Sequence, residues 1–169
     1  MRDVLDIHTH TLISGHAYNT IMEMAHAASE KGLKLLGITD HAPEMPGGPH
    51  RFYFDNLKVM PREIDGMPLL FGTEINICDF EGRLDLPEST LQKLDVVIAS
   101  LHIPCIKPGS IEQNTNALIK AMDNPYVNII GHPDDSRYPV DYEKLVKAAK
   151  EKHVLLELNN TSLNPDGPR

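Results

Sequence analysis

The chain contains nine histidines among 169 residues, and seven of its side chains are spaced as metal ligands would be. His8 and His10 form a His-x-His pair, and because the side chains of a strand alternate between its two faces, both imidazoles would point to the same side of a strand. The other candidates follow at longer intervals: His16, His41, Glu74, His102 and His132. Clustered imidazoles would repel one another as cations and would be costly to bury unless a metal ion binds them. The set therefore predicts a metal site.

The donor types indicate which ions this site would hold. Imidazole and carboxylate without thiolate suit zinc, with manganese and iron as alternatives, and exclude a calcium site, which requires mostly oxygen donors. Seven candidates exceed the four ligands that one zinc ion takes, so we expect more than one divalent ion. A cluster of such ions holds a phosphoryl group and lowers the pKa of bound water to about 7. These properties predict hydrolytic chemistry with activated water as the nucleophile.

Six short apolar runs rich in Val, Ile and Leu provide the framework for these residues. Such runs are typical of strands that are buried on both faces of a parallel sheet. They cover residues 4–7, 35–38, 69–71, 96–99, 128–130 and 154–158. A polar residue closes each run, the last one being Asn159 with Asn160, and these residues recur every 28 to 33 positions counted from His10. Each unit therefore places a polar side chain at the carboxyl end of its strand.

Helix signals lie between the apolar runs. Thr20 and Glu23 form a capping box, and Gly32 is placed to end the helix that follows. Apolar spacing predicts another helix over 113–122 and a third that begins after Asp141. Alternating strands and helices imply right-handed βαβ units, and hence an α/β fold with a parallel sheet. Since only a barrel points every strand's carboxyl end at one shared site, the pattern favours a (β/α)-barrel with about six units in this chain.

Several polar residues lie beside the candidate ligands in the sequence. Asp40, Asp134 and Asp135 are equally suited to orienting imidazoles and to being ordinary loop acids. Ser14 and Ser100 are interpreted as loop hydroxyls or as hydroxyls that contact the ligands, because neither lies in a Gly-x-Ser-x-Gly nucleophile motif.

Other residues are candidates for the rim of the site. Arg137 follows His132 by five residues and is the candidate for binding a substrate phosphate, with an exposed loop position as the alternative. Residues 42–51 are rich in Pro and Gly and are expected to form an irregular loop over the mouth of the site. Four further residues are interpreted as solvated surface positions: His26, His50, Arg51 and His153.

Length and composition are those of one globular domain, which we assign to residues 1–169. The formal net charge of −8 argues against nucleic-acid binding, and no apolar run approaches the ~20 residues of a membrane helix. The chain begins without a signal-peptide core. Its two cysteines, Cys78 and Cys105, are interpreted as buried reduced thiols. Together these features predict a cytoplasmic protein.

Five short motifs together resemble those of the PHP (polymerase and histidinol phosphatase) domain family. They are Asp6-Ile7-His8-Thr9-His10-Thr11, Ile38-Thr39-Asp40-His41, Gly72-Thr73-Glu74, Leu101-His102 and Gly131-His132-Pro133, in this order. Within the family the chain is most similar to the YcdX-type phosphatases, which residues 16–18 and 156–160 also resemble. The resemblance extends over essentially the whole chain.

This resemblance implies a distorted seven-stranded (β/α)-barrel that carries up to three metal ions, usually zinc, and hydrolyses phosphoesters. It implies three ligand groups: His8, His10 and Glu74; Glu74, His102 and His132; and His16 with His41. Glu74 would then bridge two ions. The implied substrate is a small phosphomonoester, and self-association into a homo-oligomer is compatible with the resemblance.

The family pattern ends with an Asp-x-His motif on a seventh strand, and no such motif follows the sixth predicted strand here. Six strands leave a barrel of this kind open, with unpaired backbone groups on two edge strands. Residues 164–169, with Asp-Gly and two prolines, are typical of a turn that leads onward. We therefore expect a longer polypeptide or a second chain to supply the missing strand and motif.

Two other functions fit the same residues. Amidohydrolase-type barrels cleave C–N or C–O bonds with a similar histidine-rich mouth, but they usually carry a metal-bridging lysine at a strand end. No lysine closes a predicted strand here. The second alternative is an incomplete barrel that binds metal or a partner chain without turnover, and a phosphatase assay with added zinc or manganese distinguishes it from an enzyme.

Overall fold

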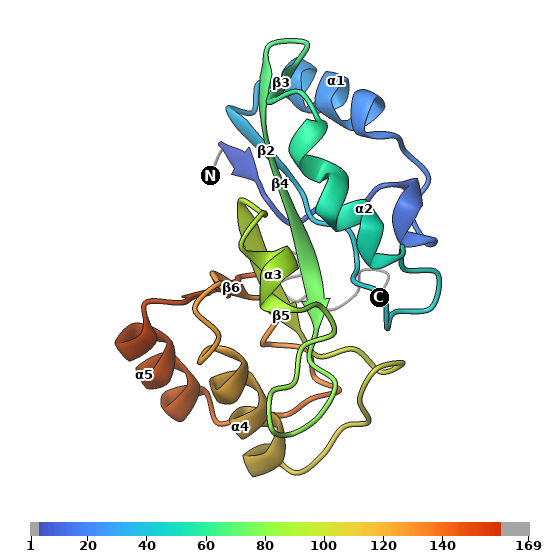
Figure 1. The fold of residues 1–169 in the computed structure, drawn as a ribbon. Helices are drawn as coiled ribbons and strands as arrows, with labels where there is room; N and C mark the ends of the chain where they lie inside the picture. The colour runs from blue at the N-terminus through green and yellow to red at the C-terminus, as the bar shows by residue number, and fades with distance from the viewer. Residues whose placement is uncertain (1–3, 160–169) are drawn as a thin grey trace.

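The computed structural model describes residues 4–159, which form a curled parallel sheet flanked by helices (Figure 1). The parallel strands are β1 (Leu5–Asp6), β2 (Leu35–Ile38), β4 (Met67–Asn76), β5 (Val96–Ser100), β6 (Ile129–Ile130) and β7 (Leu155–Leu156). They pair in the order β1-β2-β4-β5-β6-β7, without the reversal that marks a doubly wound sheet. This half-barrel confirms the predicted α/β barrel-type fold. One further strand, β3 (Glu63–Ile64), pairs antiparallel with the start of β4.

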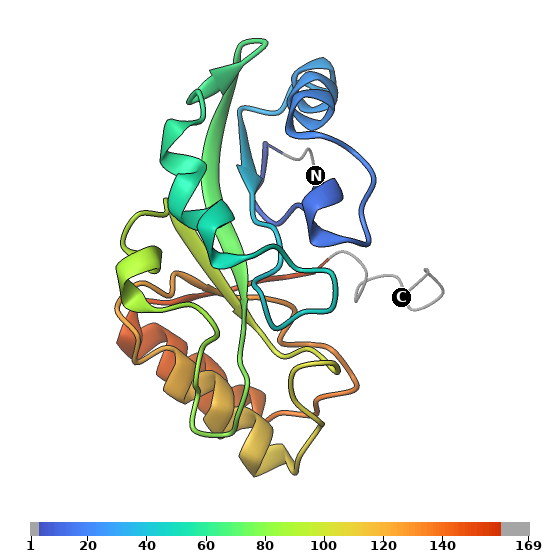
Figure 2. The same ribbon diagram turned by 45° about the vertical axis from the view of Figure 1, so that its right-hand side comes forward.

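The helices flank the sheet on the face whose side chains form the larger apolar core. They are η1 (Leu12–Ser14), α1 (Ile21–Lys31), α2 (Arg51–Asn56), η2 (Leu57–Val59), α3 (Glu88–Leu91), α4 (Ile111–Ala121) and α5 (Tyr142–Lys152). Helices α1 and α2 lie beside β2 and β4, whereas α4 and α5 lie side by side near β5 and β6 (Figures 1 and 2). Within the described residues, none of these helices is both long and apolar enough to cross a bilayer.

The two faces of the sheet hold different side chains. Phe71 and Ile75 of β4 belong to the larger core, which includes residues of the flanking helices. Leu70 packs in a smaller cluster with Ile98, and that cluster contains only residues of the strands and their ends. Because side chains alternate along a strand, Glu74 lies on the same face as Leu70, away from the helices. The inner face is therefore apolar along its length and becomes polar at its carboxyl end.

Local sequence signals explain most of the helix boundaries. The capping box of Thr20 and Glu23 begins α1, and Gly32 ends it with a φ of 76°, as predicted. Asp141 caps α5, also as predicted. Helix α4 begins two residues earlier than expected, because Ser110 and Gln113 form a second capping box.

Residues 42–50 form an irregular loop, as predicted, but residue 51 already belongs to a helix. Arg51 is the first residue of α2, and Nδ1 of His50 caps that helix by accepting the N–H of Phe52 at 3.2 Å. The Arg51 guanidinium lies 3.2 Å from Asp55, one helical turn away. Both residues are exposed, as predicted, but they lie at the start of a helix and not within a loop. The helix α2 has only six residues, which is too few for a helical repeat of apolar residues to be recognised in the sequence, and it follows a Pro- and Gly-rich segment.

The two cysteines are free, but they are half-buried rather than fully buried. Partial burial raises the pKa of the Cys78 thiol to about 12 and that of Cys105 to about 11. Both thiols are therefore protonated and weakly nucleophilic at neutral pH.

Candidate metal centre

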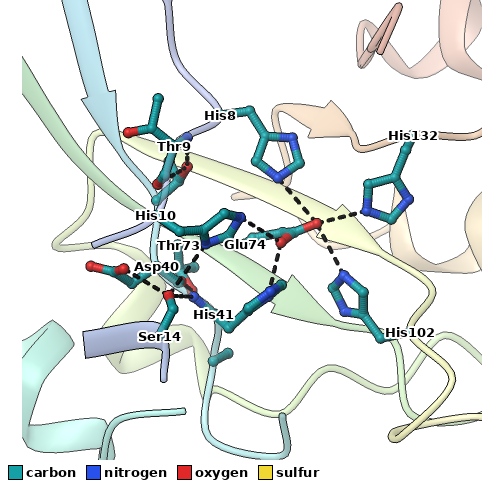
Figure 3. Close-up of polar contacts among 12 residues, drawn as sticks. His8, Thr9, His10, Ser14, Asp40, His41, Thr73, Glu74, His102 and His132 are labelled. Atoms are coloured by element: carbon teal, nitrogen blue, oxygen red, sulfur yellow. Dashed lines mark hydrogen bonds and ion pairs between the residues drawn. The ribbon is translucent and has the colours of Figure 1, made fainter. Parts of the chain in front are cut away.

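All seven side chains predicted as ligands line one cavity of about 460 Å³ at the carboxyl ends of the strands. They are His8, His10, His16, His41, Glu74, His102 and His132. The rest of the lining comes from Asp134, Asp135, Ser136, Arg137 and Asn159. Figure 3 shows imidazoles from several strand ends pointing at one carboxylate in the centre. Parallel strands bring together residues that are about 30 positions apart in the chain.

Glu74 of β4 is the centre of the cluster, with a side chain that is only 1% exposed. Its Oε1 lies 3.1 Å from Nε2 of His8, 3.1 Å from Nε2 of His102 and 2.8 Å from Nε2 of His132 (Figure 3). One carboxylate oxygen therefore faces three imidazole nitrogens.

The second oxygen of Glu74 faces the other half of the cluster. Oε2 lies 3.2 Å from Nε2 of His10 and 2.8 Å from Nδ1 of His41. His16, which is exposed, completes this half, because its ring centroid lies 4.7 Å from that of His41 and 5.3 Å from that of His10. A single buried carboxylate thus bridges two groups of imidazoles.

Burial and charge oppose each other at Glu74. Desolvation alone would raise its pKa, but the contacts with the imidazoles of His10, His102 and His132 outweigh burial and hold the pKa well below its ordinary value. For His41 burial dominates and lowers the pKa to about 4. The anionic carboxylate is therefore retained, while His41 offers a neutral nitrogen.

Glu157, which follows β7, orients two of the histidines. Its Oε1 lies 2.7 Å from Nδ1 of His8, and its Oε2 accepts the backbone N–H of His132 at 2.6 Å. Burial alone would lower the pKa of His8, but Glu157 and Glu74 together raise it to about 10. His132 has a φ of 29°, an uncommon conformation for a residue other than glycine, and the contact with Glu157 holds it there.

The sequence pattern did not single out Glu157 as a site residue, because it lies within the last predicted strand, over residues 154–158, whereas the observed strand β7 ends at Leu156. The predicted polar closers of that strand were Asn159 and Asn160. Asn159 lines the cavity, and its Nδ2 donates to Oε2 of Glu157 at 3.4 Å. Asn160 lies outside the described residues.

Asp40 supports the N-terminal half of the cluster through Ser14. Its fully buried carboxylate accepts the Ser14 hydroxyl at 2.7 Å and the Tyr53 hydroxyl at 2.7 Å. Ser14 Oγ in turn accepts the backbone N–H of His41 at 3.0 Å and lies 3.3 Å from Nδ1 of His10. Since the Ser14 proton is used on Asp40, Oγ can only accept from His10. The structure therefore supports an orienting role for Asp40, which acts on His10 and His41 through Ser14.

The donor atoms form three close groups, each with members within 4.8 Å of one another: His8, His10 and Glu74; His10, His16 and His41; and His41, Glu74 and His102. The first group coincides with the first ligand set implied by the resemblance. Nδ1 of His102 lies 2.7 Å from the Asn76 amide oxygen, which can only accept. A neutral His102 therefore turns the lone pair of Nε2 toward Glu74. A lone pair and a carboxylate that face each other are complementary to a cation, so the residues fit divalent metal ions.

The sequence model of the PHP domain matches residues 6–161. The chain belongs to the PHP domain family. It is 57% identical over 162 residues to a probable phosphatase of Clostridium novyi, covering 96% of this chain and 66% of that protein. It is 59% identical to a probable phosphatase of Clostridium botulinum strain Okra, covering 96% and 67%. A probable phosphatase of Caldanaerobacter subterraneus is 58% identical, covering 96% and 64%. The chain thus spans about two thirds of the length of these relatives.

The rim of this PHP domain carries Arg137, as predicted. Asp135 accepts hydrogen bonds from Nε of Arg137 at 2.9 and 3.0 Å and from Nη2 at 2.6 Å. This pairing lowers the pKa of Asp135, since the contacts with Arg137 outweigh the effect of burial. Asp135 therefore orients the guanidinium and contacts no imidazole ligand through any bond seen in the described residues. Asp134 lines the cavity, and its buried Oδ1 has no hydrogen-bond partner in the described part of the chain.

The remaining polar candidates do not line the cavity. His26 is 62% exposed and lies 3.6 Å from Glu30 on the same helix, as expected for a surface residue. His153 ends α5 with a φ of 58° and is exposed. Ser100 is fully buried, and a side chain at Gly131 would lie 2.3 Å from its Oγ, so this contact requires glycine. None of residues 42–51 lines the cavity.

Proposed function

We propose that this protein is a metal-dependent phosphoesterase that hydrolyses small phosphomonoesters. The observation that carries the proposal is the convergence of six imidazoles and one carboxylate on a single cavity. Membership of the PHP family and relatives named probable phosphatases support it. Up to three divalent ions, with zinc expected first and manganese or iron as alternatives, would supply the Lewis acidity that activates water and neutralises phosphate charge.

The chain's own residues would position these ions and the substrate. Glu74 would be shared between two ions, because its two oxygens face different imidazole groups. Glu157 and Ser14 would hold His8 and His10 with Nε2 toward the cavity. Arg137 would bind a phosphate oxygen through Nη1, because Asp135 occupies Nε and Nη2.

The lining of the cavity in the described residues also bears on the amidohydrolase alternative. It contains no lysine that could bridge two metal ions. The arginine on the rim suits a phosphate better than a neutral amide. Both observations favour the phosphoesterase.

We also propose that the complete enzyme contains polypeptide beyond this half-barrel, either further along the same chain or from a second copy. Within residues 4–159, strands β1 and β7 each pair on one side only, and the relatives are longer than this chain. The intact mass of the natural protein tests this: we expect either a mass above 18.9 kDa or a stable dimer. A monomer of 18.9 kDa that holds three ions with full activity would contradict it. The likeness to YcdX-type phosphatases, the cytoplasmic location and the lack of nucleic-acid binding stay predictions.

Metal content and substrate range test the phosphoesterase directly. After reconstitution with zinc or manganese, elemental analysis of the folded protein should find at least one equivalent of tightly bound metal. The metal-loaded protein should hydrolyse a generic aryl phosphate slowly, and a chelator should abolish the activity. Less than one equivalent of metal would refute the proposal. Cleavage of amides with no activity on a panel of phosphomonoesters would replace it with the amidohydrolase alternative.

A further inference from the structure

A chain of polar contacts runs behind His102, on the side of its ring that faces away from Glu74. Nδ1 of His102 lies 2.7 Å from Oδ1 of Asn76, which is fully buried at the end of β4. Nδ2 of Asn76 donates to Oδ2 of Asp85 at 2.7 Å and to the carbonyl oxygen of Ala42 at 3.2 Å. The backbone N–H of Asn76 also donates to Oδ1 of Asp85, at 2.9 Å.

The position of Asn76 follows from the geometry of β4. Asn76 lies two residues after Glu74, so both side chains point to the same face of the strand. The parallel register places Glu74 beside Ile98 and Asn76 beside Ser100 on β5, just before His102. A single strand therefore supplies the carboxylate that faces Nε2 of His102 and the amide that faces its Nδ1.

The surroundings of Asn76 allow only one orientation of its amide. The Ala42 carbonyl has no proton to give, and the Asp85 carboxylate accepts three N–H bonds, two from Asn76 and one from the backbone of Glu44 at 2.9 Å. A flipped amide would place its oxygen against both acceptors and lose the two hydrogen bonds that Nδ2 donates to them. The amide oxygen of Asn76 must therefore face His102.

This orientation decides which nitrogen of His102 carries the proton. Nδ1 must donate, because an amide oxygen only accepts, and a neutral imidazole then has its lone pair on Nε2. That lone pair faces Oε1 of Glu74 at 3.1 Å, on the cavity side of the ring. The opposite tautomer would place N–H on the side where a metal ligand needs a lone pair.

We propose that Asn76 and Asp85 are positioning residues that hold His102 as the Nδ1–H tautomer, with Nε2 presented to the cavity. Asp85 acts through Asn76, by fixing the amide, and does not itself contact His102 through any bond seen in residues 4–159. This inference rests on the proposed function in one respect only, namely that Nε2 of His102 binds a metal ion. The tautomer itself is a property of the metal-free protein.

Long-range ¹H–¹⁵N correlation spectra of metal-free protein labelled at histidine nitrogens measure the tautomer. In the spectrum of the neutral His102 ring, Nδ1 should carry the proton and Nε2 should carry none. A neutral His102 protonated at Nε2 in the native protein would overturn the proposal without any variant.

Two substitutions and one matched control complete the test. Asn76→Leu removes the acceptor, and Asp85→Asn removes the constraint on the amide, so each should give a mixture of neutral tautomers. Asp95→Asn is the control, because Asp95 also accepts a β4 backbone N–H, that of Phe71 at 2.7 Å, but lies away from the cavity lining. It should keep the native tautomer. An unchanged His102 tautomer in folded Asn76→Leu or Asp85→Asn would refute the role of the residue replaced.

Metal affinity is the second readout, measured by competition with a chromophoric chelator. Zinc affinity should fall by about 10- to 100-fold in Asn76→Leu and Asp85→Asn, as is typical of lost partners of metal ligands, and should be unchanged in Asp95→Asn. Equal affinities in all four proteins would refute the positioning role. Failure of the proposed function looks different: the native protein would show the Nδ1–H tautomer but bind no zinc.

Discussion

The central strands β4 and β5 differ from the edge strands β1 and β7 in almost every respect. β4 has ten residues and β5 has five, and all five residues of β5 are buried. β1 and β7 have two residues each, with Leu5 50% exposed and Leu155 65% exposed. The central strands therefore contribute most of the packed sheet, whereas the edges contribute little apolar burial.

The functional side chains are nevertheless divided between these regions. β4 carries Glu74, the buried centre of the cluster, whereas His8 and Glu157 follow the two edge strands. β1 and β7 share no backbone pairing in the described sheet, but Nδ1 of His8 and Oε1 of Glu157 meet at 2.7 Å across the gap. The centre of the sheet therefore supplies the packed core and the shared carboxylate, while side chains that follow the edge strands complete the cluster.

The largest expected effect follows from Glu74→Ala on the central strand. This change removes the carboxylate that faces both imidazole groups, so two ions should be lost together. Phosphatase activity should fall by roughly 10³-fold or more, because the ions supply several kcal/mol of transition-state stabilisation. Elemental analysis and an aryl phosphate assay measure these effects. His26→Ala is the control and should keep its metal, and equal metal loss in the two variants would show that the assigned ligands are wrong.

The next effect concerns the core of the sheet. Phe71 of β4 is 2% exposed, so Phe71→Ala should lower the free energy of unfolding by about 3 to 5 kcal/mol. Leu155→Ala on β7 should lower it by about 0.5 kcal/mol or less, because that side chain is mostly exposed. Urea denaturation of the metal-free proteins provides both values. Similar losses from the two substitutions would abolish the distinction between centre and edge.

A smaller effect is expected from Glu157→Gln at the edge. The carboxylate accepts from both Nδ1 of His8 and the backbone N–H of His132, whereas an amide has one accepting oxygen and must lose one of these contacts. Zinc affinity should fall by about 10- to 100-fold, with little change in the free energy of unfolding. Glu143→Gln, at an exposed position of α5, is the matched control. A loss of stability without a loss of affinity would mean that Glu157 has a structural role only.

With the exception of His16, the positions of the candidate ligands could be predicted from the sequence because each follows an apolar run, and parallel strands carry such residues to a common edge. The barrel-type order of the strands could be predicted from the same repeat of strand and helix along the chain. Asn76 was also within reach of this reasoning, since it lies two residues after Glu74 on the same face of one strand. The second capping box, at Ser110, was visible in the sequence as well.

The partners of the ligands depend on distances that no local pattern encodes. His8 and Glu157 are 149 residues apart, and their contact depends on how far the whole sheet curls. Asp40 supports His10 and His41 through Ser14, which lies 26 residues earlier in the chain. Helix α2 was missed because six residues are too few to show a helical period. Strand pairing was therefore predictable, and side-chain contacts across the cavity were not.

The smallest expected effect is at the amino end of the central strands, where Asp95 precedes β5. Oδ2 of Asp95 accepts the backbone N–H of Phe71 at 2.7 Å, and Oδ1 accepts Nη2 of Arg62 at 2.6 Å. Partial burial alone would raise the pKa of Asp95, but these hydrogen bonds outweigh it and lower the pKa below its ordinary value. Asp95→Asn should therefore lower the free energy of unfolding by about 1 kcal/mol or less at neutral pH.

The pH dependence of this effect gives it a distinct signature. Because the carboxyl has a lower pKa in the folded than in the unfolded protein, its stabilisation is complete above the unfolded value of about 3.9 and is lost as pH falls through the folded value. The difference between native protein and Asp95→Asn should be constant near neutral pH and shrink in acid, as urea denaturation at several pH values would show. The side chain of Asp123, which pairs with Lys152 of α5, is 63% exposed. Asp123→Asn should therefore change the free energy of unfolding by less than Asp95→Asn does at every pH. A larger loss there would mean that pairing at the centre of the sheet contributes less than pairing at the surface.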